Sequence, residues 1–76
     1  MFRLTPVNWK KLDCVFKKAG FALEREAGSH RVYSKPGVAR PVIIPKYTSV
    51  GIDIIKSNLK SAGIVREEYF RLLSSC

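Results

Sequence analysis

The stretch FALEREAGSHRVYSKPGVARPVIIP, residues 21–45, contains the pattern from which the fold of this 76-residue chain can be predicted. From Phe21 onward, apolar residues alternate with small or charged ones, which is the period of a strand with one dry side. The pattern predicts strands at residues 21–26, 30–34 and 40–44, with Pro45 closing the last. The turn sequences between them are Ala27-Gly28-Ser29 and Lys35-Pro36-Gly37. Three consecutive strands joined by turns this short are expected to form an antiparallel sheet.

Helical periodicity flanks these strands on both sides. A first helix is expected to begin at Thr5-Pro6 and to end at Gly20, because apolar residues recur there at spacings of three and four. A second helix is expected from about residue 52 to Gly63, after a polar connection. A short last helix begins at about Arg66, with two glutamates in its first turn, where the helix dipole favours anions.

The order of elements predicts one α+β domain spanning residues 1–76, with an αβββα layout and a short C-terminal helix. Two amphipathic helices should cover one face of the three-stranded antiparallel sheet and leave the other face open to water. This layout, combined with excess positive charge, is the plan of a double-stranded-RNA-binding-like fold. Topology alone does not determine function, so the charged and titratable residues carry the next step.

The charge balance favours a polyanionic partner. Fourteen Lys and Arg residues against six Asp and Glu give a net charge of +8, distributed along the whole chain. A folded surface with this excess attracts nucleic acid, although an acidic protein partner would fit equally well. The apolar content is too high for a disordered basic tail.

The chain is expected to be a soluble cytoplasmic protein with no membrane association, because no apolar run is long enough for a bilayer and the N-terminus does not resemble a signal peptide. The two cysteines, Cys14 and Cys76, lack metal-site spacing, and no metal or other cofactor is expected. They could pair in principle. The sequence favours Cys14 as a small core residue on the first helix and Cys76 as an exposed end.

His30 is the chain's one histidine, and it follows Gly28-Ser29 at the start of a strand. Its alternation with Val32 places it on the core side, although a strand end is a thin part of the core. An imidazole with an ordinary pKa near 6.5 can take a proton from an RNA 2′-hydroxyl without a metal ion. On composition alone, a lone histidine without a chemical role is the more frequent case.

Three neighbours of His30 share one strand parity: Arg31, Tyr33 and Lys35. If this parity faces the open side of the sheet, Tyr33 could stack on a base, and cross-strand packing is the equally weighted alternative. Arg31 and Lys35 would contact phosphates rather than read bases, because flexible cations on a strand position a backbone without selecting sequence.

A succession of short motifs spans nearly the entire chain: a lysine-rich helix, Ala19-Gly20-Phe21, Gly28-Ser29-His30 with Val32 and Tyr33, Val42-Ile43-Ile44-Pro45, Ile55 to Leu59, Ala62-Gly63-Ile64 and Arg66-Glu67-Glu68-Tyr69-Phe70. In this order and spacing, the motifs resemble the HicA (YcfA-like) toxin family of HicAB toxin–antitoxin systems. The resemblance implies a toxin of a type II toxin–antitoxin system, an mRNA-cleaving endoribonuclease of double-stranded-RNA-binding-like fold that a HicB-like antitoxin inhibits.

The resemblance also implies roles for individual residues. Gly28-Ser29-His30 matches the family's glycine, serine and catalytic histidine, so His30 is the expected catalytic residue. Gly28 would supply turn geometry, and Ser29 could donate to a phosphate. Some relatives carry a second histidine after the third strand, where this chain has Pro45-Lys46-Tyr47. The role of that second histidine is therefore absent here or is taken by Lys46.

Three interpretations remain open from sequence. In the first, His30 deprotonates the 2′-hydroxyl, nearby cations stabilise the phosphorus centre, and water, Lys46 or Tyr47 protonates the leaving oxygen. In the second, the chain is a non-catalytic RNA-binding module of double-stranded-RNA-binding-like fold. In the third, the basic surface docks an acidic protein and RNA binding is incidental.

Overall fold

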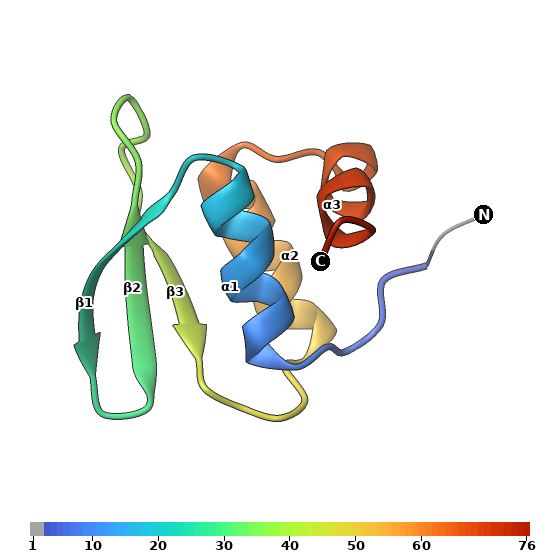
Figure 1. Cartoon of the computed structure of the whole chain (residues 1–76), viewed down its shortest axis with the longest axis horizontal. Helices are drawn as coiled ribbons and strands as arrows, with labels where there is room; N and C mark the ends of the chain where they lie inside the picture. The colour runs from blue at the N-terminus through green and yellow to red at the C-terminus, as the bar shows by residue number, and fades with distance from the viewer. Residues whose placement is uncertain (1–2) are drawn as a thin grey trace.

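The computed structural model describes residues 3–76 of the chain. Within them the elements run in the order α1 (Trp9–Lys18), β1 (Ala22–Ala27), β2 (His30–Ser34), β3 (Val42–Pro45), α2 (Ile52–Ala62) and α3 (Arg66–Leu73). The three strands form one antiparallel sheet in the order β1-β2-β3. Figure 1 shows the sheet on one side of the molecule, the helices on the other and α3 farthest from the strands. The predicted α+β class and αβββα order are confirmed.

The start of α1 differs from the sequence prediction. The helix begins at Trp9 rather than at Thr5-Pro6, and the side chain of Asn8 caps it by accepting from the amide of Lys10 at 2.9 Å. The preceding segment stays extended because Val7 pairs with Val50 in an isolated antiparallel bridge, through N–H···O contacts of 3.3 and 2.7 Å. A long-range backbone pairing therefore overrides a good local helix-start signal.

The other predicted helix boundaries agree more closely with the structure. Gly20 follows α1 with a φ of 98°, and Gly63 ends α2 with a φ of 72°, both in the left-handed region that glycine adopts without strain. Helix α3 begins at Arg66 as predicted, after Val65, which provides no side-chain cap.

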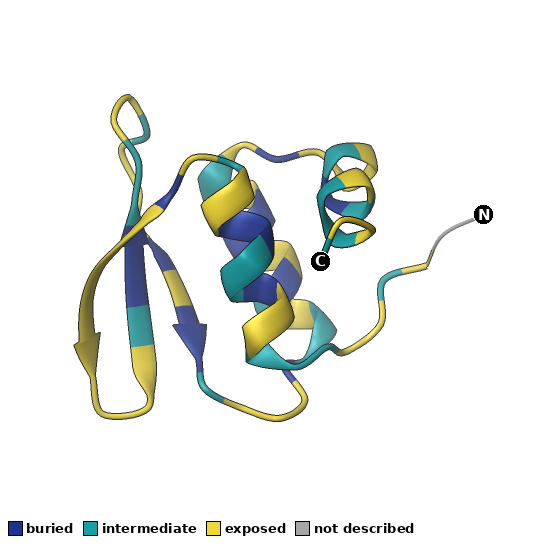
Figure 2. Ribbon diagram, in the orientation of Figure 1, coloured by how far each residue is buried: buried dark blue, intermediate teal, exposed yellow. Residues whose placement is uncertain are grey.

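Strand β1 has no dry face, contrary to the sequence prediction. All six of its residues are exposed, as the colouring in Figure 2 shows, because β1 is an outer strand paired to β2 alone. The helices pack near the opposite edge of the sheet, where α1 and α2 contact β3. Phe21, the residue just before β1, is buried and meets Phe16 edge to face at 5.7 Å between ring centroids. It closes the end of the core without belonging to the strand.

The side of the sheet that faces the helices is identified by contacts across the core. The hydroxyl of Tyr33 on β2 donates to a carboxylate oxygen of Asp13 on α1, and the guanidinium of Arg31 lies over the ring of Trp9. Their β3 partners Val42 and Ile44 are fully buried. We call this the helix face. Alternate residues, beginning with His30, point to the opposite side, which we call the open face.

The free edge of β3 is closed by α2. Asn58, itself buried, donates its amide to the carbonyl of Ile43 at 2.8 Å and accepts from the amide of the same residue at 3.2 Å. Both backbone groups that β3 turns away from β2 at this position are thereby satisfied, so no further strand can pair there.

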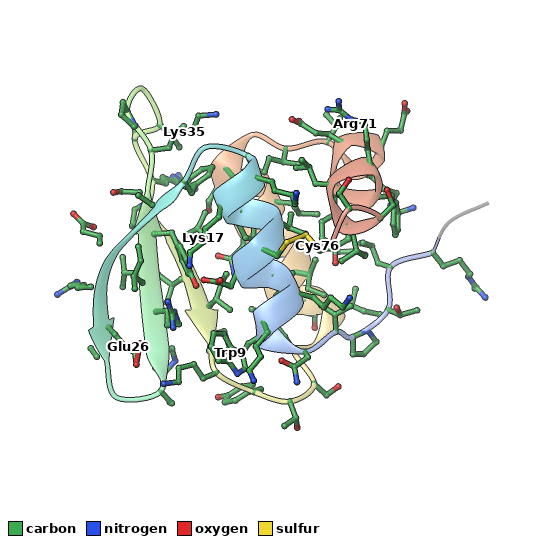
Figure 3. All side chains as sticks on the ribbon, viewed as in Figure 1. Trp9, Lys17, Glu26, Lys35, Arg71 and Cys76 are labelled. Atoms are coloured by element: carbon green, nitrogen blue, oxygen red, sulfur yellow. A yellow bond between two sulfur atoms is a disulfide. The ribbon has the colours of Figure 1, made fainter. Side chains whose placement is uncertain are left out.

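A disulfide joins Cys14 on α1 to Cys76, with a Cα–Cα distance of 6.1 Å. The sequence allowed this pairing in principle but favoured a plain core residue at Cys14 and an exposed end at Cys76, and that preference is wrong. The carbonyl of Cys76 also accepts from the ammonium of Lys11 at 2.8 Å. Helix α3 brings the end of the chain back across α1, a placement that the spacing of two distant cysteines does not reveal (Figure 3).

Candidate functional site

The candidate site starts at the hairpin between β1 and β2. Gly28 and Ser29 form a two-residue turn between the paired residues Ala27 and His30. Gly28 takes a φ of 59° while Ser29 does not have a positive φ, which is the pattern of a turn with glycine in its first central position. A side chain at Gly28 would meet no atom within 4 Å, so backbone conformation, not space, favours glycine here.

His30 lies at the first position of β2 and is exposed. Its cross-strand neighbours are Ala27 on β1 and Pro45 on β3. Its imidazole makes no hydrogen bond or ion pair within residues 3–76. The strand parity that placed His30 on the core side is wrong, because this parity belongs to the open face, and His30 reaches solvent at the start of the strand. Val32 shares that parity and is nonetheless buried, so the burial of Val32 is no guide to the side that the core occupies.

The helix face at the same end of the sheet holds a chain of charges. The carboxylate of Glu26 pairs with the ammonium of Lys46 at 2.8 Å and with the guanidinium of Arg31 at 3.4 Å. Arg31 reaches Asp13 at 3.6 Å, and Asp13 also pairs with Lys17 at 3.2 Å. The hydrogen bond from Lys46 and the charges of both cations hold the pKa of Glu26 below its ordinary value.

Trp9 packs against these charges. The Arg31 guanidinium carbon lies 5.1 Å from the centroid of its ring, and the Lys46 nitrogen lies 5.8 Å from it. Such cation–π contacts, together with the ion pairs, hold both cations on the helix side of the sheet. Figure 3 shows Trp9 and Glu26 at the same end of the molecule. Trp9 is half-buried at the margin of the core, and its ring also supports charged side chains.

Tyr33 is not available for base stacking. It is completely buried, and its hydroxyl bonds to Asp13. Burial, reinforced by the neighbouring Asp13 carboxylate, raises the pKa of its phenol well above the ordinary value. The placement of Tyr33 on the open face is wrong for the same reason as that of Arg31: both point toward α1, where Asp13 and Trp9 contact them.

Lys35 lies at the far end of the sheet from the hairpin. Its ammonium donates to the carbonyl of Ala19 at 2.8 Å and lies 5.8 Å from the centroid of the Phe21 ring. Figure 3 shows Lys35 and Glu26 at opposite ends of the strands. The structure thus does not bring Lys35 to His30.

Three of the remaining sequence-predicted residues do come together. The amide of Lys46 donates to the carbonyl of Ser29 at 2.6 Å, which ties the end of β3 to the turn before His30. Tyr47 follows, with its side chain half exposed, and its carbonyl accepts from the amide of Trp9 at 3.1 Å. The result is an exposed corner at Ser29 and His30, next to the backbone of Lys46, whose ammonium is turned to the helix face.

Sequence reasoning missed Arg25 and Glu26. A β-bulge shifts the register between Leu23 and Arg25, and it pairs Arg25 with Val32 and Glu26 with Arg31. Simple alternation counted from Phe21 cannot predict this arrangement, because the bulge changes the face to which every later residue of β1 points.

Two features are absent from the described residues 3–76. No group of three or more His, Cys, Asp or Glu side chains is arranged to hold a metal ion there. No helix in the same range is long and apolar enough to cross a membrane.

Comparison with known proteins places the chain in a family. No curated protein matches the sequence. A family model described as the HicA toxin of bacterial toxin–antitoxin systems matches residues 9–64, from the first residue of α1 to just beyond α2. This match covers most of the 76 residues and includes the hairpin and the exposed corner. The chain therefore belongs to the HicA toxin family of toxin–antitoxin systems.

Proposed function

We propose that this toxin is an endoribonuclease that cleaves mRNA in the cytoplasm without a metal ion and that His30 is its catalytic residue. The observation that carries the proposal is the position of His30. The residue is exposed on the open face, its imidazole has no partner within residues 3–76, and it directly follows the Gly28-Ser29 turn. A side chain at this position adds no packing to the core and is accessible to a substrate.

The reaction follows from the chemistry of imidazole and RNA. A ring nitrogen of His30 takes the proton of a 2′-hydroxyl, and the 2′-oxygen attacks the adjacent phosphorus. The bond from phosphorus to the 5′-oxygen breaks, which leaves a 2′,3′-cyclic phosphate on one fragment. The other fragment leaves as a 5′-alkoxide and requires a proton. One histidine cannot supply that proton at the instant when it acts as base.

Of the two side chains that the sequence suggested for the acid, we favour Tyr47. Its side chain is half exposed and not held by an ion pair, whereas the ammonium of Lys46 is bound to Glu26 on the helix face. Water is the remaining source of the proton. Ser29 is exposed at the turn, and in this proposal it donates its hydroxyl to a phosphate oxygen.

The net charge supports RNA as the substrate class. A positive surface concentrates a polyanion, and a fast, salt-dependent encounter is expected. A HicB-like antitoxin would block the reaction by covering His30 and the cations near it. An acidic protein encoded beside this one would be the partner to test first.

The test compares the parent protein with His30→Ala in EDTA, with labelled single-stranded and duplex RNA. Because His30 is exposed and unpaired, the variant should fold with an unchanged unfolding midpoint. We expect cleavage by the parent, at least about 100-fold slower cleavage by the variant, and retained binding that weakens as salt rises. Equal binding without cleavage by either protein would refute the enzyme and leave an RNA-binding module.

A further inference from the structure

The β-bulge in β1 determines which charged residue shares a face with His30. Before the bulge Leu23 lies opposite Tyr33, and after it Arg25 lies opposite Val32. Glu24 is the extra residue between them. Bulges of this kind redirect the side chains that follow and are common beside functional sites.

Arg25 is thereby placed on the open face. Its partner Val32 lies two residues after His30 on the same strand, so the three share one side of the sheet. The residue directly opposite His30 is Ala27, and Arg25 lies two residues before Ala27 on β1, diagonal to His30. A diagonal pair of this kind is separated by about 7–8 Å, which an arginine side chain and one phosphate group can span together. The small methyl group of Ala27 leaves the space between them open.

The guanidinium of Arg25 is also uncommitted. Arg25 is exposed, and its side chain makes no ion pair or hydrogen bond within residues 3–76. Arg31 and Lys46 contrast with it, because both share the carboxylate of Glu26 on the helix face. The same bulge produces both outcomes: it places Glu26 opposite Arg31 and leaves Arg25 without an acid opposite it.

We propose that Arg25 is the cation that binds the scissile phosphate of RNA on the open face and positions it against His30. This inference rests on the proposed ribonuclease function. A guanidinium can donate two parallel hydrogen bonds to phosphate oxygens and can stabilise the negative charge that develops there. It would perform the role that the sequence pattern assigned to Arg31.

Arg25→Gln and Arg25→Lys test this role, with Arg66→Gln as the matched control. Arg66 is an exposed arginine at the start of α3 whose side chain has no partner in the described residues, so its variant loses the same charge far from the sheet. We expect Arg25→Gln to lower kcat/KM by roughly 10- to 100-fold, Arg25→Lys to recover part of the loss, and Arg66→Gln to stay near the parent.

A binding measurement separates a phosphate contact from a structural role. In the His30→Ala background, which prevents cleavage, the slope of log affinity against log salt for single-stranded RNA should fall by about 0.7 in Arg25→Gln. Arg25→Lys should keep the parent slope, because it keeps the charge. A salt slope reduced by this amount, with an unchanged unfolding midpoint, supports a contact between Arg25 and a phosphate.

The outcomes distinguish the two proposals. If the parent protein does not cleave RNA, the ribonuclease function fails and the role of Arg25 fails with it. If the parent cleaves and Arg25→Gln cleaves equally well with the parent salt slope, Arg25 is not the phosphate ligand, and the assignment of His30 is unaffected. Equal losses in Arg25→Gln and Arg66→Gln would likewise overturn the local role, because they would show an effect of net charge alone.

Discussion

Opening the disulfide between Cys14 and Cys76 should strongly destabilise this protein. The two cysteines are 62 positions apart, so the bond closes a loop that includes nearly the whole chain from α1 to the last residue. Such a crosslink chiefly restricts the unfolded chain, and its effect increases with the length of the loop.

The expected size follows from the loop. A closed segment of this length reduces the entropy of the unfolded state by an amount equivalent to about 4 kcal/mol at 25 °C. A domain of this size has a total stability of roughly 4–11 kcal/mol. The Lys11 bond to the Cys76 carbonyl and the packing of α3 remain after reduction, yet they contribute much less. The melting temperature should fall by about 20 °C.

Thermal unfolding followed by circular dichroism measures this directly, on the protein before and after reduction with dithiothreitol. The double variant Cys14→Ser, Cys76→Ser is the control, since it should melt with the reduced protein and should not respond to the reductant. Mass spectrometry under both conditions reports the loss of two hydrogens on oxidation. Oxidised and reduced proteins that melt within about 2 °C of each other would refute the crosslink as a stabilising element.

Two other contacts give separate predictions. Burial raises the pKa of Tyr33, with a further contribution from Asp13, and burial also raises the pKa of Tyr69. The free energy of unfolding should therefore be at its full value below about pH 10 and should fall as pH rises further. The reason is that the unfolded chain loses its phenolic protons at a lower pH than the folded chain does. Tyr33→Phe should flatten this alkaline decline in urea-unfolding measurements, and an unchanged slope would contradict the assignment. Asn58→Ala should lower the free energy of unfolding by roughly 1–3 kcal/mol because it leaves the amide and carbonyl of Ile43 without partners; an unchanged urea midpoint would show that water replaces both bonds.

Elements set by local sequence were predicted well. The periodic apolar stripe and the left-handed Gly63 define α2, and the start of α3 at Arg66 was also correct. The start of α1 was not, because the bridge between Val7 and Val50 pairs residues that are 43 positions apart in the sequence. A helix-start signal such as Thr5-Pro6 contains no information about such a distant partner.

The faces of the short strands could not be assigned from alternation. Val32 and Tyr33 are adjacent and both buried, so β2 has no consistently dry parity. Tyr33 can be fully buried because its hydroxyl finds Asp13 on α1. The position of Arg31 on the helix face likewise depends on Asp13 and on Glu26, which only the bulge brings opposite it. Those partners come from two other elements, α1 and β1, and the pattern of β2 shows neither of them.

The turn and the bulge together determine what the candidate site can contain. A change of register by one residue exchanges the two faces of a strand, which would turn His30 toward α1 and bring Arg31 to the open side. The two-residue turn at Gly28 fixes the pairing at one end of the hairpin, and the bulge at Glu24 adjusts it in the middle. With this register, the acids of the helix face are opposite cations that they can neutralise. The open face keeps an imidazole and a guanidinium that no described acid pairs with, so its positive charge is available to a phosphate.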